Sequence, residues 1–304
     1  MTNWTASDIP DQQGRTAVVT GTGGLGFEDA LALAAAGADV IIAGRNRIKG
    51  AEAVARIRAA TPQAKVSFEQ VDLASLASIE AFATRLRSEI GAIDMLINNA
   101  GVMRPPRRLE TEDGFELQLG TNYLGHFALT ARLMPLLRNA DRPRVITLSS
   151  VAARHGAINF DDLNAKRDYQ PMPVYAQSKL ACLLFSLELH RRSHAAGWGV
   201  DSIAAHPGLS RTDLLHNAPG RTSTIGMLRS ALWFLFQPAA QGALPTLFAA
   251  TSPAAQAGAY YGPDRLGETR GYPALSKIPS QALDDDVSRR LWEVSQALTG
   301  VRFG

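Results

Sequence analysis

The residues with the clearest capacity for chemistry are Tyr175 and Lys179, in the run Tyr-Ala-Gln-Ser-Lys. If this run is helical, the two side chains lie one turn apart on the same helix face. A phenol exchanges its proton poorly at neutral pH, but a neighbouring ammonium favours the phenolate and makes the phenol a better acid–base catalyst. The same spacing also arises by chance, usually as a half-buried ring beside a solvated amine. Whether the pair is catalytic or a chance spacing depends on the elements that surround it.

A glycine-rich turn near the N-terminus could hold a second reactant. The β-branched run over residues 16–20 predicts a strand, residues 21–26 read Gly-Thr-Gly-Gly-Leu-Gly, and a helical pattern continues to Ala36. This order is typical of a dinucleotide pyrophosphate site, because glycines admit phosphates close to the backbone and a helix start supplies free N–H groups. A tight turn that binds no ligand is the alternative.

The end of the second predicted strand, residues 40–43, bears on the choice of nicotinamide cofactor. An NAD site would place a carboxylate here for the ribose 2′-hydroxyl, but Gly44 and Arg45 follow the strand and Asp39 precedes it. An arginine suits a 2′-phosphate, with which it forms charge-assisted hydrogen bonds. Arg45 could also be an ordinary surface side chain. The missing acid nevertheless favours NADP over NAD.

The remaining chain alternates predicted strands with predicted helices. Further helices are expected over residues 48–60, 75–90, 113–138, 173–196 and 281–298, and further strands over 66–71, 93–97, 144–148, 200–205 and 259–261. The alternation predicts an α/β fold with a single doubly wound parallel sheet, a Rossmann fold with helices on both faces. No linker divides the chain, so residues 1–304 should form one domain. Within it, residues 15–150 should mainly bind the dinucleotide, and 151–275 should carry the catalytic helix and the substrate region.

Composition excludes several other classes of protein. The chain is 46% apolar and 19% charged, and its net charge of +3 gives no reason to expect a nucleic-acid partner. It shows neither a signal peptide nor an apolar run near the roughly 20 residues that span a membrane, so we expect a cytoplasmic protein. The single Cys182 permits no internal disulfide and is most simply a core residue. Motifs for a metal site or for a hydrolase nucleophile elbow are missing from the sequence.

Seven motifs in one order make the chain resemble the short-chain dehydrogenase/reductase family. They are the glycine turn, Asp72-Leu73, Asn98 to Gly101, Asn122, Ser149-Ser150, Tyr175 with Lys179, and Pro207-Gly208 with Thr212. The resemblance covers about residues 14–263 and is closest to the retinol-dehydrogenase-like branch, through the stretches at 44–46, 121–127, 206–208 and 260–263. It implies an oxidoreductase that moves hydride between NADP(H) and the carbonyl or alcohol carbon of a lipophilic small molecule.

The resemblance also implies a role for each residue. Tyr175 would exchange a proton with the substrate oxygen. Lys179 would favour the phenolate form of Tyr175 and hold the hydroxyls of the nicotinamide ribose. Ser150 would hydrogen-bond the substrate oxygen, and Asn122 would anchor a proton-relay water. The cofactor contacts would be Gly21, Gly24, Leu25 and Gly26 at the pyrophosphate, Asp72 and Leu73 at the adenine, Asn99, Ala100 and Gly101 at the adenosine ribose, and Pro207, Gly208 and Thr212 at the nicotinamide. Homodimers or homotetramers would form through the helices around Asn122 and Tyr175.

Several features depart from the family pattern or leave alternatives open. Gly21 and Gly24 enclose two residues where the family usually has three, so a nucleotide-binding sensor or scaffold with little turnover is the alternative function. The polar insert over residues 151–172 should lie at the rim of the substrate cleft. The helical pattern over residues 224–236 suits a helix packed on the core, a substrate lid or a membrane-surface helix.

Overall fold

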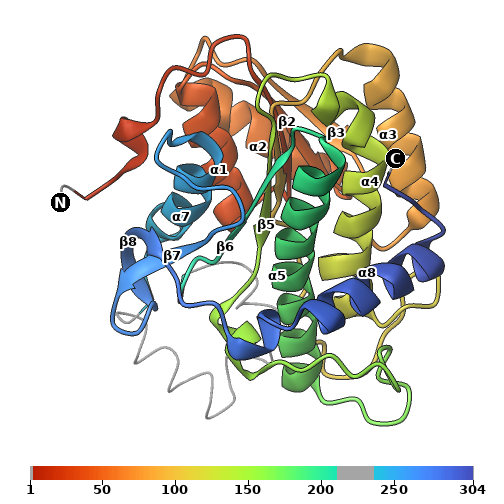
Figure 1. Ribbon diagram of the computed structural model, residues 1–304. Coiled ribbons are helices and arrows are strands. Elements are labelled where there is room, and N and C mark those ends of the chain that lie inside the picture. The colour runs from red at the N-terminus through yellow and green to blue at the C-terminus, as the bar shows by residue number, and fades with distance from the viewer. Residues whose placement is uncertain (1–2, 211–235, 304) are drawn as a thin grey trace.

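The strands join into one sheet in the computed structural model, which describes residues 3–210 and 236–303 (Figure 1). Their order across the sheet is β3-β2-β1-β4-β5-β6-β7-β8. Neighbouring strands from β3 through to β7 are parallel, and β8 pairs with β7 in the antiparallel sense. The bounds are β1 Thr16–Thr20, β2 Asp39–Gly44, β3 Val66–Gln70, β4 Met95–Asn98, β5 Arg144–Leu148, β6 Asp201–Ala205, β7 Tyr260–Arg265 and β8 Arg270–Leu275. The predicted doubly wound sheet is confirmed, with one antiparallel strand added at its edge.

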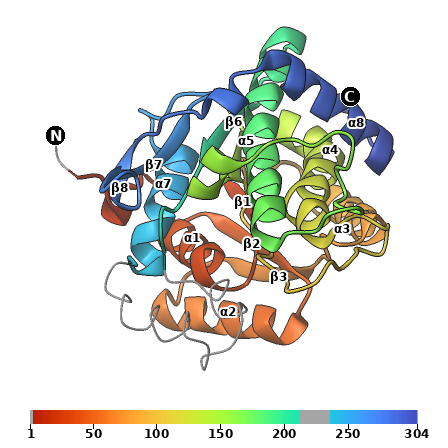
Figure 2. The same ribbon diagram turned by 90° about the horizontal axis from the view of Figure 1, so that it is seen from below.

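Helices cover both faces of the sheet, as Figure 2 shows from below. One layer consists of α1 (Gly24–Ala35), α2 (Arg47–Ala60) and α7 (Ala239–Thr251), and the other of α3 (Leu76–Glu89), α4 (Gly125–Arg138) and α5 (Pro171–Ala196). Strand side chains alternate between the two cores; Val19 faces the first layer and Val18 the second. Each fully buried aliphatic side chain stabilises the fold by about 1.5–3 kcal/mol. Cys182 lies in the second core, as predicted.

The helix expected over residues 113–138 differs from the prediction. Residues 112–114 form a turn, closed by hydrogen bonds between Thr111 and Phe115, and the helix starts at Leu117. Its first part, Leu119–Leu124, is a π-helix that continues directly into α4. Such π-turns widen the helix by one residue and are common at functional sites. Asn122 lies within this widened turn.

The C-terminal third holds elements that the sequence did not indicate. These are α7, β8 and the 3₁₀ helix Ser280–Ala282; two more 3₁₀ helices, Ala6–Asp8 and Val151–His155, lie earlier in the chain. Pro245 interrupts the apolar pattern of α7, and β8 carries a glycine and a proline that resemble a turn. The helix predicted over residues 224–236 falls almost wholly outside the described residues. No described helix has both the length and the apolar character needed to cross a membrane.

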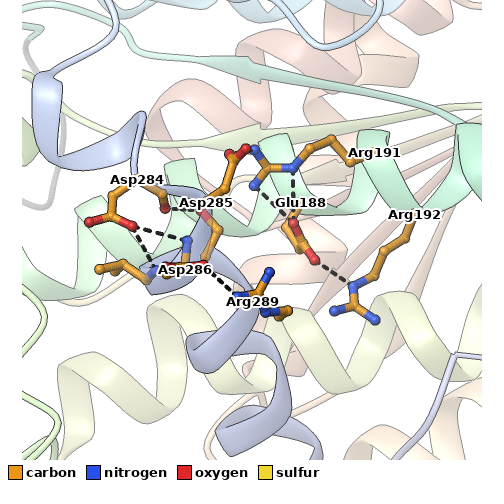
Figure 3. Close-up of polar contacts among 9 residues, drawn as sticks. Glu188, Arg191, Arg192, Asp284, Asp285, Asp286 and Arg289 are labelled. Carbon is orange, nitrogen blue, oxygen red and sulfur yellow. Dashed lines mark hydrogen bonds and ion pairs between the residues drawn. The ribbon is translucent and has the colours of Figure 1, made fainter.

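The last helix, α8 (Asp285–Thr299), lies across α5 (Figure 1). Figure 3 shows the polar contacts at its start: the Asp284 side chain accepts hydrogen bonds from the first turn of α8, and Arg191 of α5 pairs with Asp285 and Glu188. Ion pairs as exposed as Arg191–Asp285 contribute about 0–1 kcal/mol each, and the pair of Arg191 with the buried Glu188 lies within α5.

Aromatic packing holds α8 more firmly than these ion pairs. The Trp292 ring lies 5.0 Å from Phe127 of α4 and 5.9 Å from Phe185 of α5, measured between ring centroids. Deeper in the same contact, the Tyr123 hydroxyl and Ser295 Oγ lie 2.6 Å apart. Trp292 is 2% exposed, so α8 completes the core beside the π-helix.

Candidate active site

A cleft of about 850 Å³ opens at the carboxyl ends of the parallel strands, where open α/β sheets bind their ligands. Most of the predicted site residues line it. They are Gly21, Gly24, Leu25, Arg45, Asp72, Leu73, Asn99, Ala100, Gly101, Ser150, Tyr175, Lys179, Pro207 and Gly208. Gly26 and Asn122 lie behind this lining, and Thr212 lies outside the described residues. One cleft therefore joins the predicted phosphate, nicotinamide and proton-exchange residues.

Tyr175 and Lys179 project from one face of α5 into this cleft, as their spacing predicts. Both side chains are 5% exposed, and the Tyr175 ring packs against Met103 and Ala152. Lys179 Nζ donates a 2.9 Å hydrogen bond to the Leu148 carbonyl at the end of β5. A buried ammonium held on a carbonyl is fixed in position, so it can act on a phenol and on sugar hydroxyls without reorganising.

Ser150 reaches the same cleft from the start of the short helix Val151–His155. Its Oγ accepts a hydrogen bond from Ala152 N at 3.2 Å and so caps this helix. The preceding hydroxyl, Ser149 Oγ, donates instead to the Lys179 carbonyl, which binds the end of β5 to α5. Both serines line the cleft, and the Ser149 hydroxyl is engaged by the Lys179 carbonyl.

Asn122, within the π-helix, forms hydrogen bonds to two segments beneath the cleft. Its Oδ1 accepts from Val102 N at 2.7 Å, and its Nδ2 donates to Val102 O and to Ser178 Oγ, each at 3.0 Å. The Ser178 hydroxyl donates in turn to the Tyr175 carbonyl. Asn122 therefore ties the loop after β4 to the helix that carries Tyr175, and its role as a water anchor stays a prediction.

A buried histidine, which the sequence analysis did not single out, connects Asn122 to the cofactor end. His126 is 2% exposed; its Nδ1 lies 2.9 Å from the Asn122 carbonyl and its Nε2 lies 2.9 Å from Thr20 Oγ1. Burial lowers the pKa of His126 to about 4, so the ring is neutral at pH 7. Thr20 Oγ1 also accepts from the backbone N–H groups of Asn99 and Ala100. The only sequence signal for His126 was its place in the 121–127 motif.

The shortened glycine loop keeps the geometry of a phosphate cradle. Gly21 and Gly24 have positive φ values of 105° and 53°, a region that glycine enters without strain. A Cβ on Gly26 would lie 2.5 Å from Asn99 Nδ2, which itself donates to Thr20 O at 2.7 Å. Because α1 begins at Gly24, its first N–H groups have no partner within the helix. The loop therefore suits a pyrophosphate despite its missing residue, and Asn99 supports it from below.

Positive charge gathers at the far end of the cleft. Arg45 and Lys49 line it near the start of α2, where Asn46 Oδ1 caps the helix by accepting from Lys49 N, and Arg56 lines it from further along α2. Glu52 is the acid that lines the cleft beside them, one turn into α2. The end of β2 itself carries Gly44, as the sequence indicated.

The described part of the chain contains no group of three His, Cys, Asp or Glu side chains that could bind a metal ion. The cleft instead offers fixed hydrogen-bond donors, a buried ammonium and a phenol. This donor set suits a dinucleotide cofactor and a reacting oxygen.

Comparison with known proteins identifies relatives over nearly the full length. The sequence profile of the short chain dehydrogenase family matches residues 15–221. Retinol dehydrogenase 13 from Mus musculus is 40% identical, with 95% of this chain and 84% of the relative covered. Polyprenol dehydrogenase from the same species is 39% identical, with 97% of this chain and 87% of the relative covered.

Solved structures share the fold. An uncharacterized protein from Mycobacterium paratuberculosis has a TM-score of 0.82 and 39% identity, and all of both chains is covered. The RhlG/NADP complex from Pseudomonas aeruginosa has a TM-score of 0.65 at 23% identity, with 82% of this chain and 94% of that chain covered. With the family's profile matched over most of the chain, the predicted family is confirmed: the protein belongs to the short-chain dehydrogenases and is an NAD(P)-dependent oxidoreductase acting on CH–OH groups.

Proposed function

We propose that the protein is an NADP(H)-preferring oxidoreductase for a lipophilic alcohol, aldehyde or ketone, with Tyr175 as the general acid–base. The observation that carries the proposal is the placement of Ser150, Tyr175 and Lys179 around one cleft whose other end is the glycine loop. NADP(H) would supply or accept the hydride, held at its pyrophosphate by the start of α1 and at its nicotinamide end by Pro207 and Gly208.

The proposed chemistry needs two donors at one oxygen. During reduction, the Ser150 hydroxyl hydrogen-bonds the substrate oxygen and stabilises the negative charge that develops there. Tyr175 gives its hydroxyl proton to the same oxygen, and it removes that proton during oxidation. The ammonium of Lys179, fixed on the Leu148 carbonyl, stabilises the phenolate that remains. The apolar packing around Tyr175 keeps water away from the exchange.

Tyr175→Phe tests this mechanism. The variant keeps the ring and its packing but has no proton to exchange, so kcat should fall at least about 100-fold, the lower range for a lost general acid. NADPH affinity, measured by fluorescence titration, should stay within about twofold because most cofactor contacts lie elsewhere. A variant that retains wild-type turnover, with any substrate the wild type accepts, would refute the role of Tyr175.

Cofactor preference is proposed from the positive charges at the far end of the cleft. A 2′-phosphate there would accept charge-assisted hydrogen bonds worth about 1.5–3 kcal/mol from Arg45, with Lys49 nearby. Arg45→Ala should therefore weaken NADPH binding roughly 10- to 150-fold and NADH binding little. Arg47→Ala is the matched control, since Arg47 lies two residues on and donates to Gln70 outside the cleft. Equal losses for both cofactors, or tighter binding of NADH by the wild type, would contradict the preference.

A lipophilic substrate is proposed from the apolar side chains near Tyr175. Met103, Val151, Ala152, Met172 and Leu209 line this part of the cleft. Flexible methionines adapt to apolar chains of different shape. Relatives named retinol dehydrogenase and polyprenol dehydrogenase support the same class. In a series of straight-chain aldehydes or alcohols, kcat/KM should rise with chain length; a flat series would argue against this class.

The insert before Tyr175 forms part of this rim, as its sequence position suggested. Arg108 Nε donates to Asn164 O, and the Tyr169 hydroxyl donates to Pro105 O, so the insert is fastened to the loop after β4. Met172, the last residue of the insert, lines the cleft. The insert is thus anchored at two points beside the substrate region.

Assembly into homodimers or homotetramers remains a proposal, and the structure bears on which surface they would use. The helices around Asn122 and Tyr175 were expected to form the contact. Because Trp292 of α8 and Phe303 of the segment after α8 pack on Phe185 of α5, we propose that any assembly uses another surface. Light scattering of the wild type would give its assembly state directly.

A further inference from the structure

We propose that Glu268 is a positioning residue for the reaction, because it fastens the Pro207-Gly208 turn and the short helix after Ser150 to one carboxylate. Glu268 belongs to the tight turn between β7 and β8 and is not itself among the residues that line the cleft. The inference rests on the proposed function, since it concerns how the two walls that flank hydride transfer are held relative to each other.

Three groups from separate segments converge on the Glu268 carboxylate. Oε2 accepts from Arg154 Nη2 at 2.6 Å and lies 3.1 Å from His206 Nε2, while Oε1 accepts from Lys277 N at 3.1 Å. These contacts lower the pKa of Glu268 to about 2, with the His206 hydrogen bond as the largest cause. The carboxylate is therefore charged at every pH at which the protein would be assayed.

On the cofactor side, His206 transmits this contact to the turn beside the nicotinamide site. Its side chain is fully buried, and its Nδ1 accepts from Gly208 N at 3.2 Å. Nδ1 as an acceptor leaves Nε2 as the donor, which points to Glu268 and to Ser276 Oγ at 3.0 Å. The neutral ring thus spans the distance from the carboxylate to the backbone of Gly208.

A second link joins the same two segments beside the histidine. Leu209 N donates to Thr269 O at 2.7 Å, directly after Glu268 in sequence. A Cβ on Gly208 would lie 2.3 Å from that same Thr269 oxygen, so the two backbones are in close contact. Any movement of the β7–β8 turn must therefore move the Pro207-Gly208 turn.

On the substrate side, Arg154 lies in the short helix Val151–His155 that Ser150 caps. Its Nη2 pairs with Glu268, and its Nη1 donates to Gly267 O at 3.1 Å. Both hydrogen bonds go to the β7–β8 turn, although Arg154 lines the cleft. The guanidinium therefore connects the Ser150 helix with the segment that holds Pro207 and Gly208.

The turn that carries Glu268 has an uncommon backbone conformation. Leu266, Gly267 and Glu268 have positive φ values of 49°, 66° and 67°. For the two residues that are not glycine, such a conformation is unfavourable and persists where surrounding contacts enforce it. Strain of this kind concentrates at functional sites. The contacts of the Glu268 carboxylate with Arg154, His206 and Lys277 fix this side chain within the turn.

Glu268→Gln tests the proposal, because an amide keeps the shape but presents an N–H₂ group to at least one of the three donors. We expect kcat to fall at least about tenfold, since small misplacements of reacting groups are costly. NADPH affinity should stay within about twofold, and the isotope effect from deuterated NADPH should rise as hydride transfer slows. Glu80→Gln is the matched control: Glu80 accepts hydrogen bonds from Arg87 and Thr84 and forms an ion pair with Arg132, on a surface remote from the cleft.

Arg154→Gln alone, and Arg154→Gln combined with Glu268→Gln as a double variant, complete the test. If Glu268→Gln fails to fold, Arg154→Gln takes its place. If both residues act as one unit, the double variant should lose no more activity than the poorer single variant. A kcat within twofold of wild type in either single variant would overturn the proposal, as would additive losses. So would a loss of kcat accompanied by an equal loss of NADPH binding. An inactive wild type with every substrate would instead refute the proposed function.

Discussion

The close approach of Asn99 to Gly26 makes Gly26→Ala the sharpest test of the cofactor loop. The added Cβ would lie 2.5 Å from Asn99 Nδ2, 2.8 Å from the Gly21 carbonyl oxygen and 3.2 Å from the Thr20 carbonyl oxygen. The first two distances are below any normal contact, and the second involves backbone that cannot rotate away. The loop and Asn99 must therefore separate.

The expected cost follows from these contacts. Overpacking a tight site costs about 1–3 kcal/mol, and loss of the Asn99–Thr20 hydrogen bond adds about 1 kcal/mol, so the free energy of unfolding should fall by about 2–4 kcal/mol. If the displaced loop also loses one hydrogen bond to a phosphate oxygen, worth about 1.5–3 kcal/mol, NADPH binding should weaken roughly 10- to 150-fold.

Chemical unfolding and fluorescence titration measure the two effects separately. Gly91→Ala is the control, because a Cβ there would meet nothing within 4 Å. Asn99→Ala combined with Gly26→Ala should recover part of the stability by removing the 2.5 Å conflict, although the Gly21 conflict remains. A Gly26→Ala variant with the stability and NADPH affinity of the control would refute the account of this loop.

Two further predictions concern stability. Asp29 of α1 is fully buried, neither of its oxygens has a hydrogen-bond partner among the described residues, and burial raises its pKa well above the ordinary value. The folded chain then keeps this proton to higher pH than the unfolded chain, so its contribution to stability is fully present below about pH 4 and is lost as pH rises. Relative to Asp29→Asn, the unfolding free energy of the wild type should therefore fall as pH is raised above about 4 in urea titrations, and a constant difference would contradict this. Trp292→Ala should lower the free energy of unfolding by about 3–5 kcal/mol through loss of core packing, whereas Asp285→Asn should lower it by less than about 1 kcal/mol. Thermal or urea unfolding measures both, and similar losses in the two variants would show that ion pairs, not aromatic packing, hold α8.

The sequence was informative where local pattern and tertiary structure agree. Strands β1 to β6 were placed to within a residue or two, because most of them are short apolar runs closed by a glycine or by polar residues. The spacing of Tyr175 and Lys179 was sufficient to predict that their side chains share one helix face, because both lie on one uninterrupted helix, α5. This helix begins at Pro171, and proline is favoured at the first position of a helix. Local patterns of this kind depend on nearby residues alone.

Other features depend on partners far away in the chain and were missed for that reason. The π-helix around Asn122 has no composition that distinguishes it from an α-helix. Thr20 and His126 lie 106 positions apart, and Glu268 lies 62 positions from His206, so neither contact could be inferred from spacing. Asn99 was assigned to the adenosine ribose by resemblance, whereas its described contacts show that it also supports the glycine loop.

The contact between α8 and the π-helix has a consequence for synthesis of the protein. Tyr123 and Ser295 are separated by 172 positions, and α8 follows every other helix in chain order. During translation, the strands and α5 can therefore assemble while Phe127 and Phe185 still lack the Trp292 ring that covers them. Exposed aromatic surface on a partly folded chain promotes aggregation. In the interval between the emergence of α5 and that of α8 from the ribosome, this aromatic surface is therefore open to aggregation.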